Sequence, residues 1–387
     1  MTQMTVKRVG VIGGGQLAWM MAEAAQKLGI DLVIQTPSKG DPAVSIAKEV
    51  VFASIDDAVA TAKLSTLCDV ITFENEFINL EALKSLETQG VCFRPSLKVL
   101  NPLLDKYQQR CYLKKIGLPT PQFAALENPS QLEFDFPLVL KSRRHGYDGQ
   151  GTFIIQSLEQ LKATCNRLEG VSLMVEQFIP FERELAVMAA RSVTGEVIVY
   201  PVVETYQQDQ VCHWVIVPAG VSEKIQKEIR EIADHLLNQL GVVGIFGIEL
   251  FSTSQGQILV NEIAPRTHNS GHYTLDGCDT SQFEMQLRAV SGLSLGSPKL
   301  KSSGAVMVNL LGYEESHHDY SEQRHKIAKI ARSFVHWYGK TESRPGRKLG
   351  HATVLIGDGE EYITHETSRK QLLAIAQKIE SIWYHQY

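Results

Sequence analysis

The stretch GIELFSTSQGQILVNEIAPRTHNSGH (residues 247–272) is the most informative part of this chain for its fold and its chemistry. Two apolar runs flank a turn at 253–256, a pattern that predicts an antiparallel β-hairpin. If the turn centres on 255–256, Glu249 faces Glu262 across the hairpin. Two like charges at facing positions repel each other, which costs up to ~1 kcal/mol. Their apolar neighbours indicate that water does not fully solvate the pair.

A bound divalent cation would remove this conflict. Hard oxygen ligands with room for phosphate oxygens favour magnesium over zinc. The alternative is a β-bulge that separates the two glutamates. Directly after the hairpin, a proline-led turn carries Arg266, His268 and Asn269 within four residues, and such a turn could hold a small anion and stabilise developing charge.

A second polar segment, KSRRHGYDGQG (residues 141–151), follows a predicted strand at 137–141. It places three cationic side chains and three glycines in eleven residues, which is typical of a mobile flap over a polyphosphate. The segment is not a Walker A motif, because the chain has no G-x-x-x-x-G-K-[ST] pattern. A solvated surface loop is the alternative interpretation.

The N-terminal part alternates strands and helices, beginning with a predicted strand at 6–12 and a predicted helix at 16–28. This alternation indicates a parallel sheet covered on both faces. The loop at 13–18 fits G-x-G-x-x-A and could bind a phosphate at the helix N-terminus, or it could be a tight turn without a ligand. A nicotinamide dehydrogenase is disfavoured, because the second strand ends at Gln35 and Thr36 without the carboxylate that holds a ribose.

The composition sets wider limits on the function. A chain of 387 residues is long enough for two or three domains, and its 44% hydrophobic and 21% charged residues are the balance of a soluble globular protein. The net charge of −5 argues against nucleic-acid binding. We expect a cytoplasmic protein, because the sequence has neither a signal peptide nor an apolar run long enough to span a membrane. The scattered cysteines predict neither a zinc site nor a disulfide framework. The basic cluster at 340–348 could hold a phosphorylated substrate or be a solvated turn.

Taken together, these segments resemble the ATP-grasp superfamily and, within it, the 5-(carboxyamino)imidazole ribonucleotide synthase family. The resemblance runs from about residue 9 to residue 350 and depends on the order and spacing of GGGQL (13–17), Asp105-Lys106, GYDGQG (146–151), EQFI (176–179), NEIAPRTHNSGH (261–272) and WYGK…RPGRKLGH (337–351). It implies a fold with α/β and α+β parts. These are a parallel α/β N-terminal domain like that of biotin carboxylase (1–98), a central ATP-grasp domain (99–297) with a lid at about 120–182, and a small β-rich C-terminal domain (298–387).

The same resemblance implies an activity and a site. The activity is the ATP- and bicarbonate-dependent carboxylation of the exocyclic amine of 5-aminoimidazole ribonucleotide through carboxyphosphate, in purine biosynthesis, by a homodimer that binds neither nucleic acid nor membrane. Glu249 and Glu262 are the implied Mg²⁺ ligands, and Arg266, His268 and Asn269 are implied to hold bicarbonate and carboxyphosphate. The implied ATP-binding residues are Lys106, Lys141, Gly146, Tyr147, Asp148, Gly149, Gln150, Gly151, Thr152, Glu176, Gln177, Phe178, Ile179, Glu184, Gln207, Asn261 and Glu262. The implied ribonucleotide-binding residues are Gly15, Gln16, Leu17, Glu76, Tyr147, Asp148, Lys340, Arg347 and Lys348.

Two features depart from the family pattern. Gln207 stands where the family often has a histidine on the nucleotide, which puts one ATP contact in doubt. Ala18-Trp19-Met20 follows GGGQL where the family often has GRM, which could alter the packing of that helix. Two alternatives stay open: a formate-dependent glycinamide ribonucleotide transformylase of the same superfamily, and a catalytically silent nucleotide-binding regulator. The lid sequence and the basic cluster favour the carboxylase, and the paired glutamates disfavour a regulator.

Overall fold

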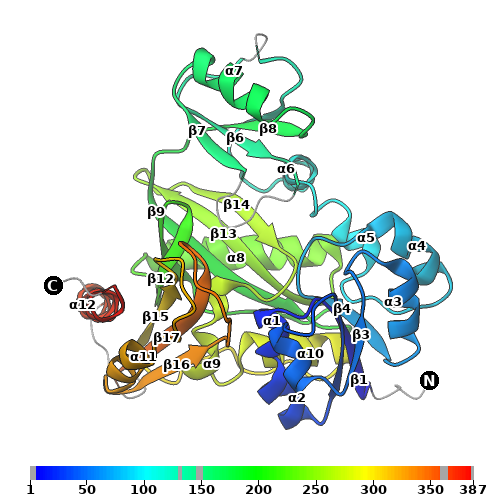
Figure 1. Ribbon diagram of the computed structural model, residues 1–387. Helices are drawn as coiled ribbons and strands as arrows, with labels where there is room; N and C mark the ends of the chain where they lie inside the picture. The colour runs from blue at the N-terminus through cyan, green and yellow to red at the C-terminus, as the bar shows by residue number, and fades with distance from the viewer. Residues whose placement is uncertain (1–5, 130–132, 145–150, 358–364, 385–387) are drawn as a thin grey trace.

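Three β-sheets with helices packed against them form the protein (Figure 1). The computed structural model describes residues 6–129, 133–144, 151–357 and 365–384. A parallel α/β unit, a central grasp and a C-terminal region with several strands confirm the predicted fold class. Within these described ranges, no helix combines the length and the apolar character that crossing a bilayer requires.

The N-terminal unit is built on a parallel sheet with the strand order β3-β2-β1-β4. Its strands are β1 (Arg8–Ile12), β2 (Asp31–Thr36), β3 (Glu49–Phe52) and β4 (Val70–Phe73). One face packs against α2 and against α10 (Gln282–Ser291) of the central region, and the other packs against α3 and α4. The helices of this unit are α1 (Gln16–Trp19), α2 (Ala22–Leu28), η1 (Pro42–Ile46), α3 (Ala58–Ser65), α4 (Leu80–Thr88) and α5 (Leu97–Leu100).

The predicted single helix at 16–28 is wrong in one respect, because the chain turns between α1 and α2. Ala18, Met20 and Met21 are all buried. In one continuous helix Ala18 and Met20 would point to nearly opposite faces, so the break allows both side chains to reach the core. Gly29 ends α2 in the left-handed conformation with φ 65°, as its position after the helix predicts.

The lid is a small antiparallel sheet with the strand order β5-β8-β6-β7, drawn in green and cyan at the top of Figure 1. Leu138 and Leu140 of its central strand β6 pack against Leu161 of α7 and form a separate core. The lid follows α6 (Lys106–Lys115) and consists of β5 (Phe123–Ala125), β6 (Leu138–Ser142), β7 (Thr152–Ile155), α7 (Leu158–Arg167) and β8 (Leu173–Gln177).

The central sheet has nine strands with the order β14-β13-β9-β11-β12-β15-β17-β16, and β10 pairs with β9 beside this path. The C-terminal strands β15, β17 and β16 continue this sheet through the pairing of β12 with β15, so the proposed second and third domains share one sheet. The strands are β9 (Phe181–Arg191), β10 (Val197–Val199), β11 (Val203–Gln208), β12 (Val211–Val217), β13 (Gly244–Thr253), β14 (Ile258–Ala264), β15 (Gly304–Leu311), β16 (Ser333–Trp337) and β17 (Lys348–Ile356).

Helices cover this sheet and carry the chain between its halves. The predicted helix at 222–240 is α8, which begins after Ser222, whose side chain accepts the Ile225 N–H, and ends at Gly241. The sequence did not predict α12, a helix of 19 residues that packs on β12 and β15. The helices are α8 (Glu223–Leu240), η3 (Asn269–Gly271), α9 (Thr274–Gly277), α10 (Gln282–Ser291), α11 (Ser321–Ala328) and α12 (His365–Trp383).

Candidate active site

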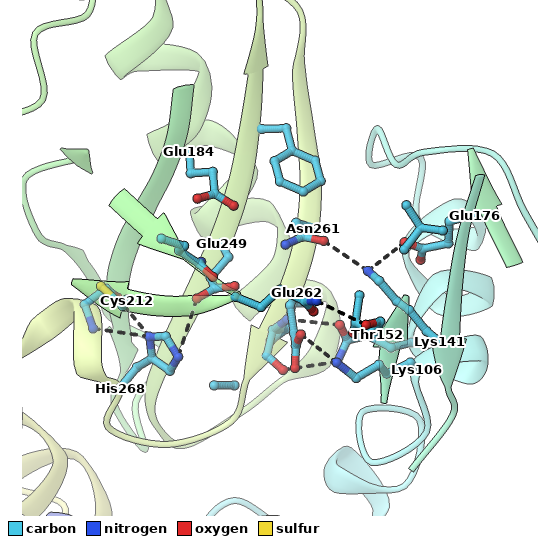
Figure 2. A pocket seen from close by; sticks show the side chains of 18 of the residues that line it. Lys106, Lys141, Thr152, Glu176, Glu184, Cys212, Glu249, Asn261, Glu262 and His268 are labelled. Atoms are coloured by element: carbon cyan, nitrogen blue, oxygen red, sulfur yellow. Dashed lines mark hydrogen bonds and ion pairs between the residues drawn. The ribbon is translucent and has the colours of Figure 1, made fainter. Parts of the chain in front are cut away.

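A cavity of about 660 Å³ lies between the lid and strands β13 and β14 of the central sheet (Figure 2). Most of the predicted ATP-binding residues line it; they are Lys106, Lys141, Thr152, Glu176, Gln177, Phe178, Ile179, Glu184, Gln207, Asn261 and Glu262. Gly151 is described but does not line the cavity. The predicted lid residues Gly146, Tyr147, Asp148, Gly149 and Gln150 lie outside the described residues.

The two glutamates of the hairpin face each other in the cavity, as the sequence predicts. Glu249 of β13 pairs in register with Glu262 of β14. A bulge is present, but it follows this pair: Leu250 pairs with Val260, so Asn261 is the extra residue. A regular strand would point Asn261 and Glu262 to opposite faces, and the bulge brings both into the cavity. The irregularity therefore adds a third oxygen donor instead of separating the pair.

The charges around this pair are unequal. Lys106 Nζ lies 2.8 Å from Glu262 Oε2. Burial alone would raise the pKa of Glu262, but Lys106 and Lys141 outweigh burial and hold this pKa below its usual range. Burial, followed by the charges of Glu262 and Glu184, raises the pKa of Glu249 to about 7. Burial also raises the pKa of Glu184 to about 7. The cavity is thus short of positive charge on the Glu249 side.

A buried ion-pair group at the base of the lid fixes Lys141. Glu176 accepts from Lys141 Nζ at 2.7 Å and from Arg110 Nε at 2.6 Å. Burial by itself would raise the pKa of Glu176, but these two cations lower it to about 2. Lys141 Nζ also donates to Asn261 Oδ1 at 3.2 Å, across the cavity floor (Figure 2). Both carboxylate oxygens of Glu176 are thus engaged by these two cations.

The predicted anion-binding turn lies at the far end of the cavity. Arg266, His268 and Asn269 all line it. Arg266 Nε forms an ion pair with Glu76 Oε1 at 2.9 Å, and His268 Nε2 lies 3.6 Å from Glu249 Oε1. The side-chain amide of Asn269, whose contact with an anion stays a prediction, is held by a second amide. Its Nδ2 donates to Asn309 Oδ1 at 2.9 Å, and its Oδ1 accepts from Asn309 Nδ2 at 2.8 Å. This reciprocal pair fixes the turn.

The glycine loop of the N-terminal unit already holds an anion of the protein. Glu74 accepts from the backbone N–H of Gly15 at 2.7 Å, of Leu17 at 3.0 Å and of Ala18 at 3.4 Å. A side chain on Gly15 would place its Cβ 2.5 Å from Glu74 Oε1, so this carboxylate explains the glycine there. A carboxyl group of the protein thus takes the favourable position at the helix N-terminus. That Gly15, Gln16 and Leu17 contact the ribonucleotide stays a prediction.

The basic cluster reaches the same region from the C-terminal strands. Lys340 Nζ donates to Gln16 Oε1 at 2.7 Å and to the Lys348 carbonyl at 2.7 Å. Lys348 and Glu76 line the cavity, whereas Gln16, Lys340 and Arg347 do not. Arg347 Nη1 donates to the Glu342 carbonyl at 2.9 Å. The structure thus joins Gln16, Lys340 and Lys348, and it directs the Arg347 side chain into its own turn.

A second group of possible metal ligands lies outside this cavity. Asp276, His336 and His351 each offer one atom, and these atoms lie within 4.8 Å of one another. The rings of His336 and His351 stack at an interplanar angle of 17°. A metal ion lies near the plane of each imidazole that binds it, and two rings stacked in offset, nearly parallel planes with centroids 4.6 Å apart cannot both meet that condition at one ion. This stack is therefore a packing feature, with His336 Nε2 placed 2.9 Å from Asp276 Oδ2.

Several residues of the site carried no signal that sequence reasoning could use. Gln282 of α10 accepts the His268 N–H at 2.9 Å and donates to the His268 carbonyl at 2.8 Å. Arg110, Asn309 and Glu74 likewise act on partners far away in sequence. Glu74 stands two residues before Glu76, but neighbouring positions do not reveal which backbone amides a carboxylate reaches.

Comparisons with known proteins agree along the whole chain. Models of three families match it: the ribonucleotide synthetase preATP-grasp domain at 6–101, the ATP-grasp domain at 111–283, and the phosphoribosylaminoimidazole carboxylase C-terminal domain at 305–365. The chain is 51% identical over 383 residues to the N5-carboxyaminoimidazole ribonucleotide synthase of Synechococcus elongatus, covering 98% of this chain and 96% of that one.

Solved structures give the same result. The N5-carboxyaminoimidazole ribonucleotide synthetase of Thermotoga maritima is 40% identical with a TM-score of 0.85, covering 97% of this chain and 98% of that chain. The N5-carboxyaminoimidazole synthase of Aspergillus clavatus, in complex with ADP and 5-aminoimidazole ribonucleotide, is 31% identical with a TM-score of 0.86. It covers 97% of this chain and 99% of that chain.

Replacing Glu249 by glutamine should stabilise the metal-free protein at alkaline pH. In the folded protein the pKa of Glu249 is about 7, above the value of 4.5 for an unperturbed glutamate. Between pH 4.5 and pH 7, folding therefore leads to uptake of a proton. The stability that this proton supplies is lost as the pH rises through 7. We expect Glu249→Gln to raise the melting temperature by about 2 °C at about pH 8, and to have little effect near pH 5.

Thermal unfolding followed by circular dichroism in the presence of a chelator checks this. Glu169→Gln is the matched control, because Glu169 is exposed and lies outside the cavity. A melting temperature of Glu249→Gln that stays at or below the wild-type value at every pH would contradict the assigned electrostatic conflict.

Proposed function

This chain belongs to the N5-carboxyaminoimidazole ribonucleotide synthase family of ATP-grasp ligases, and from this premise we propose how its cavity performs the family's reaction. The enzyme carboxylates the exocyclic amine of 5-aminoimidazole ribonucleotide with ATP and bicarbonate and serves purine biosynthesis. The observation that carries the proposed mechanism is the pairing of Glu249 with Glu262 beside Asn261 and two lysines. A formyl-transferring relative is not favoured, since the relatives at half identity are carboxyaminoimidazole ribonucleotide synthases.

ATP takes the cavity between the lid and the central sheet in this proposal. The backbone of 176–179 faces the adenine, because the Glu176 side chain is held by Arg110 and Lys141. Glu184 accepts from the ribose hydroxyls on the wall of β9. Lys106 and Lys141 contact the phosphates as point charges; Lys106 already pairs with Glu262, and Lys141 already donates to Asn261 next to it. The Gln207 amide lines the same cavity and replaces the family histidine as a hydrogen-bonding group.

The residues present fit a magnesium ion. Glu249 and Glu262 supply carboxylate oxygens, and Asn261 supplies an amide oxygen beside them. The Glu249 side chain is 25% exposed and the Glu262 side chain is 40% exposed, so their oxygens are accessible from the cavity. Hard oxygen donors of this kind suit magnesium, and no thiolate is among them. When bound, the ion supplies positive charge that offsets the charge of the triphosphate.

The carboxylation takes place at the end of the cavity where Arg266 and His268 lie. A bicarbonate oxygen attacks the γ-phosphorus of ATP, the bond to the β–γ bridging oxygen breaks, and ADP leaves. Carboxyphosphate then releases CO₂ beside the ribonucleotide. The exocyclic nitrogen attacks this carbon and loses one proton, which the released phosphate can accept. Arg266 stabilises the anions, and Glu76 holds its guanidinium in place. The closed lid excludes water, which would hydrolyse carboxyphosphate.

We assign the ribonucleotide phosphate to the basic cluster at 340–348, beside the N-terminal glycine loop. Because Glu74 fills the amides of the glycine loop, the cationic groups Lys340 and Lys348 remain the phosphate partners, with Gln16 beside them. The resemblance also supports a cytoplasmic homodimer, and the net charge of −5 fits a protein that acts on small molecules and not on nucleic acid.

The proposed reaction is tested by measuring ADP release with bicarbonate, with and without 5-aminoimidazole ribonucleotide. We expect release to depend on both compounds, and to be absent when glycinamide ribonucleotide and formate replace them. Release that needs glycinamide ribonucleotide and formate would contradict the carboxylase. A chain that binds nucleotide but never releases ADP would instead be a regulator.

Replacing Arg266 by alanine should stop carboxylation without preventing ATP binding. Loss of one such anion-stabilising donor lowers kcat by about 100- to 1000-fold. Steady-state assays give kcat, and calorimetric titration with ADP gives the affinity, which we expect to change by less than about twofold. Arg230→Ala, on the exposed face of α8, is the matched control. Near-normal turnover of Arg266→Ala would remove Arg266 from the mechanism.

A further inference from the structure

The turn between β11 and β12 has an unusual backbone. Gln208 pairs with Val211, so Asp209 and Gln210 form a two-residue hairpin turn. Both have positive φ, 50° for Asp209 and 64° for Gln210. This turn type favours glycine, asparagine or aspartate, and other residues are strained in the left-handed region. Asp209 suits the turn, whereas Gln210 does not.

The Gln210 side chain makes a contact that glycine could not make. Its Nε2 donates to the Thr152 carbonyl at 3.2 Å. Thr152 belongs to the lid strand β7 and pairs there with Lys141, whose Nζ donates to Asn261 Oδ1 in the cavity. Thr152 and Gln210 both line the cavity. The bond therefore joins the lid to the central sheet between two residues of the cavity lining.

The hairpin that carries Gln210 is firmly attached at its base. Arg369 of α12 donates from Nε to Glu204 Oε2 of β11 at 2.9 Å, and a second bond joins Arg369 Nη2 to Glu204 Oε1 at 2.5 Å. On β12, His213 Nδ1 lies 3.1 Å from Glu380 Oε1 of the same helix. Because the hairpin is fixed at its base, the position of its tip is also fixed, and here the tip contacts the lid.

We propose that Gln210 is a positioning residue that latches lid strand β7 over the nucleotide, and that the strained turn persists because of this contact. The proposal rests on the assignment of the cavity to ATP. The lid is also joined to the sheet by Lys141, the strand partner of Thr152, through its bond to Asn261. Strained backbone is retained at sites where the surrounding structure uses it, and a ligand clamp is one such site.

Two variants separate the latch from the strain. Gln210→Gly removes both, and Gln210→Asn tolerates the left-handed turn but is too short to reach the Thr152 carbonyl. We expect the Kd for ADP, measured by calorimetry on the full chain, to rise about three- to tenfold in both, the factor that one hydrogen bond supplies. Gln210→Gly should also raise the melting temperature of the ligand-free protein by about 1 °C, because the strain is relieved.

Kinetics distinguish a latch from a general structural role. The KM for ATP should rise in both variants while kcat at saturating ATP and the KM for 5-aminoimidazole ribonucleotide stay within about twofold of wild type. Gln208→Asn, an equal shortening at an exposed position of the same hairpin, is the matched control and should leave all three constants unchanged.

An ADP affinity within about twofold of wild type in both variants overturns the latch. A loss of affinity in Gln210→Gly alone also overturns it, because that result assigns the effect to a flexible turn. If the wild-type protein fails to bind ADP, the assignment of the cavity to ATP fails instead, and the two failures are thereby distinguished.

Discussion

Two carboxylates held face to face in a half-buried hairpin are the constraint on which the site depends. A sheet normally avoids like charges at opposed positions, because the repulsion is strengthened where water is scarce. Here the apolar strands fix Glu249 and Glu262 in register. The protein satisfies Glu262 with Lys106, and it leaves Glu249 with a raised pKa. This inequality supports the proposal that the pair holds a divalent cation beside the triphosphate.

The rest of the fold brings the reacting groups to this pair. The lid contributes Lys141 on a strand that is fixed by the Glu176 ion pairs. The N-terminal unit contributes Glu76, which meets Arg266 from the central sheet. The C-terminal strands belong to the same sheet as the acidic hairpin, so Lys348 is positioned relative to Glu249 without a flexible domain junction. Each unit therefore supplies at least one charged group, and none of them encloses the site alone.

The sequence predicts those features that depend on local patterns. The hairpin register, the capped helix at 222–240 and the alternation of the N-terminal unit follow from periodicity and turn residues, and the structure confirms them. The consequence of the bulge at Asn261 could not be predicted, because one extra residue leaves the apolar pattern almost unchanged. The partners of Glu74 and Asn269 could not be predicted either, because they lie 59 and 40 residues away in sequence, at Gly15 and Asn309. Tertiary contacts of that kind leave no trace in one sequence.

The most direct test of the account is a crystal of the protein grown with ADP and Mn²⁺, in which anomalous scattering locates the ion. We expect a manganese peak within about 2.5 Å of carboxylate oxygens from both Glu249 and Glu262, on the cavity face of the sheet. A peak that contacts neither residue, or carboxylates that point to opposite faces of the sheet, would contradict it.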